Sequence, residues 1–129
     1  MKYGEFLATV RERGEYDSQD QAEQVTTSVL EVLASRITPG EAEDLAAQLP
    51  QPLAEALQPD AQDQPESFGV EEFCARVAER TGGHPQTAEW DASAVLSTVA
   101  DAVSGGELNQ VLTQLPSGYA TLFGKPDLS

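Results

Sequence analysis

Cysteine and histidine, which supply most ligands of zinc and related metals, are almost missing from this sequence. Its 129 residues include one cysteine, Cys74, and one histidine, His84. A single cysteine cannot form an internal disulfide, which fits a reducing compartment. A metal site needs several clustered ligands, and no glutamate here is followed by a histidine three residues later, the spacing of di-iron bundles. The sequence therefore predicts no metal site, no cofactor and no catalytic residue.

Basic residues and long apolar runs are scarce as well. Lys and Arg number 7 against 22 Asp and Glu, which gives a net charge of −15 at pH 7. Nucleic-acid affinity comes largely from Lys and Arg, so we expect no direct binding to nucleic acid. No stretch approaches the ~20 apolar residues of a membrane helix, and the start of the chain lacks the apolar run of a signal peptide. We expect a cytoplasmic protein that does not contact membranes.

The sequence contains the same patterns twice. The segment EFLATVRER (5–13) matches EFCARVAER (72–80) at six of nine positions, namely E, F, A, V, E and R. Likewise, TPGEAEDLAAQLP (38–50) and SGGELNQVLTQLP (104–116) share GE and QLP at matching places. We interpret the chain as a tandem duplication. Repeat 1 is predicted over residues 2–58 and repeat 2 over residues 68–125, joined by an acidic, proline-containing linker at 59–67.

Each repeat has the pattern of helices. Apolar residues recur at helical spacing in three segments, and a short fourth segment follows the LP pair that ends the third. Aromatic residues make up only 6% of the chain, so we expect an aliphatic core. Units of this size bury too little surface to be stable alone. We therefore predict an all-α fold in which two copies of a three-to-four-helix unit pack as a pseudo-two-fold helical bundle.

The repeated phrase carries a helix-start signal rather than a catalytic motif. Thr38 with Glu41, and Ser104 with Glu107, have the S/T-x-x-E spacing of a capping box. In such a box the hydroxyl accepts a hydrogen bond from the backbone N–H of the Glu, and the Glu carboxylate reaches back to the N–H of the cap. We predict that these four residues are structural helix caps.

With both blocks in view, the chain resembles the bacterial family known as domain of unknown function 2267. Its members are similar to this chain in being small, acidic and helical, with a duplicated half that ends in a GE…QLP phrase. The resemblance extends from about Tyr3 to Phe123. It implies the duplicated helical fold, but no catalytic or ligand-binding residue carries over from it.

The best functional interpretation is a non-enzymatic interaction or scaffold module that binds another protein or a second copy of itself. Trp90 and Tyr119 are candidate partner contacts, although Trp90 also falls in an apolar stripe and fits packing at the edge of the core. One alternative is an enzyme or small-molecule binder with a carboxylate-lined cleft. Another is an acidic mimic of nucleic acid. A purely solubilising role for the acidic surface is compatible with each of these interpretations.

Overall fold

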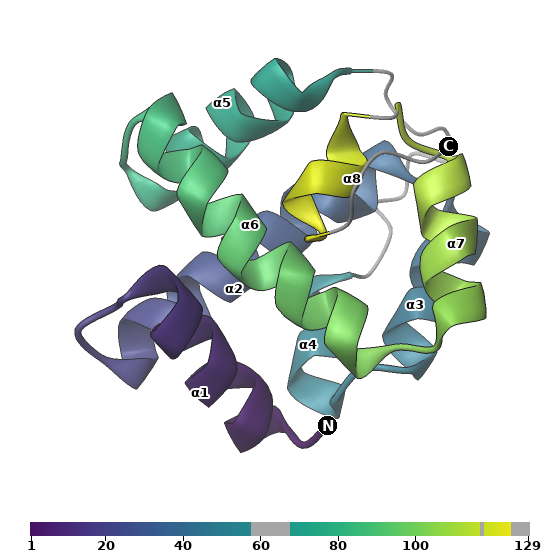
Figure 1. Ribbon diagram of the computed structural model, residues 1–129, viewed down its shortest axis with the longest axis horizontal. Coiled ribbons are helices and arrows are strands. Elements are labelled where there is room, and N and C mark those ends of the chain that lie inside the picture. The colour runs from purple at the N-terminus through teal and green to yellow at the C-terminus, as the bar shows by residue number, and fades with distance from the viewer. Residues whose placement is uncertain (58–67, 117, 125–129) are drawn as a thin grey trace.

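The structure, a computed structural model of the chain, describes residues 1–57, 68–116 and 118–124, and within these ranges it consists of helices without strands (Figure 1). The predicted all-α class is confirmed. The linker predicted at 59–67 lies outside the described residues. In chain order the helices are α1 (Tyr3–Gly14), α2 (Gln19–Arg36), α3 (Pro39–Ala47), α4 (Gln51–Ala56), α5 (Val70–Thr81), α6 (Pro85–Ala102), α7 (Gly105–Thr113) and α8 (Tyr119–Leu122).

The two halves of the chain contain helices of matching lengths. Each half begins with a helix of 12 residues, continues with one of 18 and then has one of 9. The halves differ at the turn between the first two helices. This turn has four residues in the first half (15–18) and three in the second (82–84). The extra residue places a tyrosine, Tyr16, in the first turn, where the second half has only Gly82, Gly83 and His84.

The two halves pack against each other rather than side by side as separate lobes. Helix α1 contacts α6, α2 contacts α5, and the long helices α2 and α6 contact each other. Figure 1 shows α6 crossing the front of the molecule over α2, with α3 and α7 lying together at one side. The buried side chains of both halves form one hydrophobic cluster that is mainly Leu, Val and Ala. Removing either half would therefore expose the core of the other.

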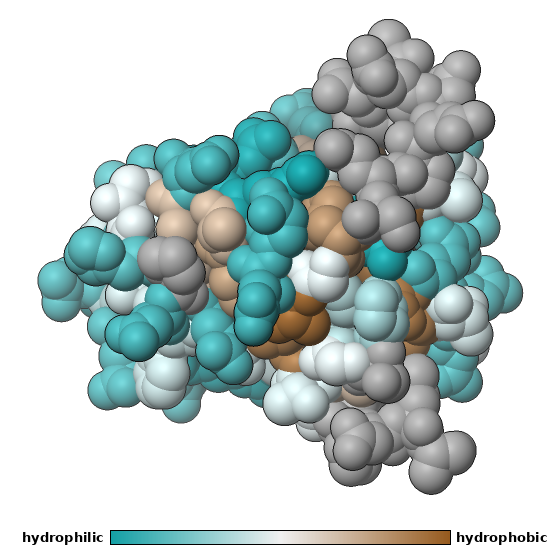
Figure 2. Space-filling view, turned by 90° about the horizontal axis from the view of Figure 1, so that it is seen from above, coloured by the Kyte–Doolittle hydropathy of each residue, from teal (hydrophilic) through white to brown (hydrophobic). Residues whose placement is uncertain are grey.

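The outer surface is mainly polar. Figure 2 shows one face on which hydrophilic residues predominate, with hydrophobic residues visible toward its middle. Among the described residues, Met1 and Trp90 are the large hydrophobic side chains that are exposed. No helix in the part of the chain that the structure describes is both long enough and apolar enough to cross a membrane.

Helices α3 and α7 begin with the hydroxyl caps that the sequence suggests. The Thr38 hydroxyl accepts a hydrogen bond from the backbone N–H of Glu41 at 3.3 Å. The Ser104 hydroxyl accepts one from the N–H of Glu107 at 3.1 Å. These bonds satisfy one free backbone donor at the start of each helix.

The other half of each capping box differs from the expectation. The backbone N–H of Thr38 donates to the Gln114 side-chain oxygen at 2.9 Å, and the N–H of Ser104 donates to the Gln48 side-chain oxygen at 2.8 Å. Each cap is thus completed by a glutamine from the opposite half of the chain, not by its own glutamate. This crossed arrangement accounts for the Gln in both QLP phrases, since each Gln caps the helix that the other phrase begins. The carboxylates of Glu41 and Glu107 are therefore not needed as acceptors for the backbone N–H groups of the two caps.

Replacing Gln114 tests the crossed caps. Gln114→Ala removes the acceptor for the Thr38 N–H and a donor to the Thr38 hydroxyl at 3.2 Å. We expect the free energy of unfolding to fall by about 1 kcal/mol, since both lost bonds lie near solvent. The matched control is Gln110→Ala, an exposed position on α7, the helix that Gln114 follows, and it should be within ~0.5 kcal/mol of wild type. Equal urea midpoints for the two variants would contradict the crossed caps.

Candidate functional site

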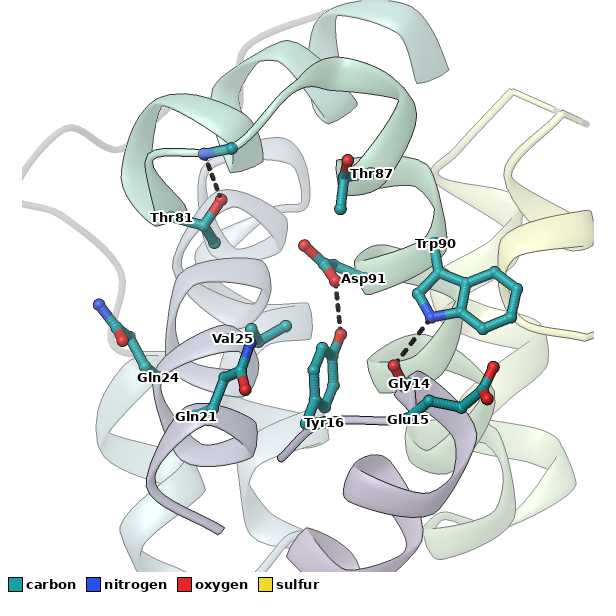
Figure 3. A pocket seen from close by; sticks show the side chains of 11 residues that line it. Gly14, Glu15, Tyr16, Gln21, Gln24, Val25, Thr81, Thr87, Trp90 and Asp91 are labelled. Atoms are coloured by element: carbon teal, nitrogen blue, oxygen red, sulfur yellow. Dashed lines mark hydrogen bonds between the residues drawn. The ribbon is translucent and has the colours of Figure 1, made fainter. Parts of the chain in front are cut away.

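A pocket lies where the first half of the chain meets the second. It has a volume of about 410 Å³ and is formed by the α1–α2 turn, α2, the end of α5 and the first turns of α6 (Figure 3). This volume is within the range of about 300–1,000 Å³ that is typical of ligand pockets. Its lining combines an aromatic pair, Tyr16 and Trp90, with the carboxylates of Glu15 and Asp91. We call these four residues and the hollow between them the Trp90 pocket.

Tyr16 is held in the pocket from three sides. Its ring packs directly over Gly14, so closely that a Cβ atom added there would lie less than 3 Å from three ring atoms. Its backbone N–H donates to the carbonyl of Arg11 at 3.0 Å. Its hydroxyl donates to a carboxylate oxygen of Asp91 at 2.6 Å, a contact visible in Figure 3. Glu15 precedes it with a φ of 56°, the left-handed conformation that ends many helices.

Asp91 places a carboxylate at the inner wall of the pocket. The residue is 6% exposed, and burial raises the pKa of its carboxyl group, while the hydrogen bond from Tyr16 lowers it. Burial, and then the hydrogen bond to Asp91, raise the pKa of the Tyr16 hydroxyl. Tyr16 is therefore a neutral donor near pH 7 and Asp91 is the acceptor, and Asp91 is in none of the ion pairs of the described residues.

Trp90 lies at the outer edge of the pocket and not in the core. Its side chain is 51% exposed, whereas the neighbouring Asp91 and Ala92 are buried. The indole N–H donates to the backbone carbonyl of Gly14 at 3.0 Å, which fixes the orientation of the ring (Figure 3). The expectation that Trp90 packs at the edge of the core is therefore wrong. Its role as a partner contact is not tested by this geometry and stays a prediction.

The other candidate partner contact, Tyr119, is fully buried. Its hydroxyl donates to the carbonyl of Phe68 at 2.9 Å, and its ring meets the Phe73 ring edge-on at a centroid distance of 5.5 Å. A side chain without exposed surface cannot contact a partner, so this expectation is wrong. Tyr119, the first residue of α8, instead packs in the core against α5.

Neither Cys74 nor His84 lines the Trp90 pocket. Cys74 is buried in α5, and burial, followed by the charge of Glu89, raises the pKa of its thiol to about 11. Such a thiol is almost entirely protonated at neutral pH and is a poor nucleophile. His84 is exposed and is the residue immediately before α6.

A second group of acidic side chains lies between α3 and α7. Glu41, Asp44 and Glu107 each place a carboxylate oxygen within 4.8 Å of the others. Glu41 and Glu107 are each 7% exposed, and Asp44 is exposed. Burial, then a hydrogen bond and the charge of Glu41, raise the pKa of Glu107 to about 7. We call these three residues the carboxylate cluster.

The sequence does not point to this cluster by any local motif. In the sequence, Glu41 and Glu107 look like capping-box residues. Only the structure shows that Gln114 and Gln48 accept the cap hydrogen bonds in their place. The available signal is the occurrence of Glu at the same place in both halves of the chain. If the first turns of α3 and α7 meet, as a two-fold arrangement predicts, these two residues must meet as well.

Comparison with protein families finds a match over most of the chain. A family model described as an uncharacterized conserved protein, DUF2267, matches residues 3–122. That range includes both the Trp90 pocket and the carboxylate cluster. Among curated proteins, no significant match is found. Since the family model covers nearly the whole chain, the protein belongs to the DUF2267 family.

Proposed function

We propose that the chain is a non-enzymatic binding module in which a duplicated helical unit forms a pseudo-two-fold body. Its recognition site is the Trp90 pocket, and its partner is a protein that inserts an Arg or Lys side chain. The observation that carries this proposal is an exposed indole, fixed by its hydrogen bond to Gly14, beside the buried carboxylate of Asp91. The matching helix lengths and the crossed caps support the duplicated, pseudo-two-fold arrangement.

The chemistry of the pocket favours a cation. An Arg or Lys side chain near a Trp ring gains about 0.5–2 kcal/mol from the interaction of its charge with the ring. Two acidic residues, Glu15 and Asp91, line the same hollow. Arg is the better fit, because its flat guanidinium can stack on the indole while its N–H groups donate to a carboxylate.

The charge of the whole chain supports the same class of partner. A net charge of −15 attracts basic surfaces from a distance and raises their rate of encounter. The pocket is also the place where the halves differ, since the four-residue turn that carries Tyr16 has no equivalent in the second half. A feature that departs from the repeat favours a role beyond folding.

Binding is favoured over catalysis because the Tyr16 hydroxyl, the group that could donate a proton in this pocket, is already hydrogen-bonded to the Asp91 carboxylate. The Tyr16 hydroxyl and the Asp91 carboxylate form a closed pair at 2.6 Å. The volume of about 410 Å³ also suits a small cationic molecule, which is the second candidate. A fluorescence titration with a basic peptide and with a small cationic molecule separates these two candidates.

The fluorescence of Trp90 tests the proposal, because it is the only tryptophan of the chain. We expect a hexa-arginine peptide to change its emission saturably at low salt, and about 0.5 M salt to weaken the binding strongly. A hexa-glutamine peptide should have no effect. Free arginine amide that binds as tightly as the peptide would favour the small-molecule candidate instead.

Matched variants separate the pocket from general attraction to an acidic protein. Asp91→Asn keeps an acceptor for Tyr16 but removes the charge, and it should weaken peptide binding by about tenfold, equivalent to ~1.4 kcal/mol. Glu15→Gln removes an exposed charge inside the pocket, and Glu55→Gln removes an exposed charge outside it. Only the former should reduce affinity. Equal losses for the two variants, or no emission change at all, would contradict the proposed site.

A further inference from the structure

The carboxylate cluster carries a second inference, which is independent of the Trp90 pocket. The geometry points to a site for a hard divalent cation of the Ca²⁺ class, held by Glu41 and Glu107 from the two halves of the chain and by Asp44 at its open side. The sequence predicts no metal site, because it contains no local motif of metal ligands. This site instead arises from residues that come together only in the folded chain.

The first observation is the spacing of the oxygens. One carboxylate oxygen from each of the three residues lies within 4.8 Å of the other two. Ca²⁺ binds oxygen at about 2.3–2.6 Å, so two ligands of one ion are separated by at most about 5 Å. Three oxygens at this spacing can therefore share one ion without rearrangement of α3 and α7. Ligands made only of oxygen favour hard cations over zinc or copper.

The second observation is independent of the spacing. The Oε2 atoms of Glu41 and Glu107 are both buried, and neither accepts a hydrogen bond from an N–H or hydroxyl group of the described residues. Each residue is 7% exposed, so water offers these oxygens little compensation. Buried carboxylate oxygens are costly unless they are paired, protonated or bound to a metal. Two such oxygens, one on each of two residues of the carboxylate cluster, would gain a partner if a cation bound there.

Within the described residues, none of the ion pairs reaches the carboxylate cluster, and the buried Arg36 donates to the backbone carbonyls of Phe68 and Gln114. The ion pairs that the structure describes join Arg13, Arg76 and Arg80 to acids outside the cluster. The Gln114 side-chain amide donates to Oε1 of Glu41 at 3.5 Å.

The cluster is accessible from one side. Asp44 is exposed and lies three residues after Glu41, on the same face of α3. Water and the ion can therefore enter past Asp44, while the two glutamates form the buried floor. Water molecules would complete the coordination, since Ca²⁺ takes six to eight oxygens.

The competing explanation is a pair of glutamates that share one proton. Melting of the full chain separates the two explanations. The protein is stripped with a chelator, returned to chelator-free buffer at pH 8, and melted with Ca²⁺, Mg²⁺ or Mn²⁺ added singly. We expect Ca²⁺ at 100-fold above its Kd to raise the Tm by roughly 5–10 °C. Calorimetric titration should give one ion per chain.

The variants assign the effect to the cluster. Glu107→Gln should abolish the Ca²⁺-dependent rise in Tm, and Glu43→Gln, at an exposed neighbouring position on α3, should retain it. If Glu107→Gln does not fold, Asp44→Asn serves instead, since this exposed residue should lower Ca²⁺ affinity without disturbing the core. No rise with any of the three cations overturns the inference and leaves the shared proton. An equal rise in wild type and Glu107→Gln also overturns it, because the ions then bind the acidic surface in general.

Discussion

Residues 1–60 expressed alone are expected not to fold as a monomer. The apolar faces of α1 and α2 pack on α6 and α5, respectively, so the first half alone would leave Phe6, Val10 and much of α2 in water. Each side chain of this size contributes about 1.5–3 kcal/mol when it is buried, and the loss of several exceeds the stability of an ordinary small domain. Circular dichroism and analytical ultracentrifugation should find a poorly helical chain or a homodimer.

The two halves mixed in solution provide the control for this experiment. Adding residues 61–129 to residues 1–60 should restore helical content, because the missing packing surfaces and the crossed glutamines become available again. A homodimer of residues 1–60 would be explained by the first half using a second copy in place of the second half. A monomeric fragment with a cooperative thermal transition would contradict the account.

Gly14→Ala is expected to have the largest effect of any single substitution proposed here. A Cβ atom at this position would overlap the ring of Tyr16, at less than 3 Å from three of its atoms. The ring cannot move without losing its hydrogen bond to Asp91, which would leave a buried carboxylate unpaired. Overpacking costs about 1–3 kcal/mol and the unpaired group another 1–3 kcal/mol, so we expect a total loss of roughly 2–6 kcal/mol.

Gly4→Ala is the matched control, because it makes the same change in the same helix. No atom lies within 4 Å of a Cβ added at Gly4. Alanine favours a helix over glycine by up to about 1 kcal/mol, so this variant should be equally or slightly more stable than wild type. Denaturant unfolding of both variants decides the matter. If the two substitutions change the free energy of unfolding alike, the packing described for Tyr16 is wrong.

The sequence predicts the helices well because each is specified locally. Phe6, Leu7 and Val10 lie at helical spacing, and all three are buried in α1. The repeated segments also predict that one residue is missing from the second half, and the structure places that difference in the turn before α6. Such features depend on residues within a few positions of each other.

The sites depend on residues that are far apart in the chain, and local patterns do not show them. The capping-box motif suggests Glu41 as the partner of the Thr38 N–H, but Gln114 takes that place from the other half. Periodicity assigns Trp90 to the core, whereas the acidic Asp91 takes the buried position and is tolerated there because Tyr16 donates to it. In each case a tertiary hydrogen bond overrides the local preference.

The two halves are expected to unfold as one cooperative body, and native-state hydrogen exchange is the sharpest test of this. The slowest amides of α2 and of α6 should exchange with the same opening free energy, and their dependence on denaturant should converge on global unfolding. Gln114→Ala should lower both values together. Two distinct opening energies, one for each half, would show that the halves unfold independently and would contradict the account.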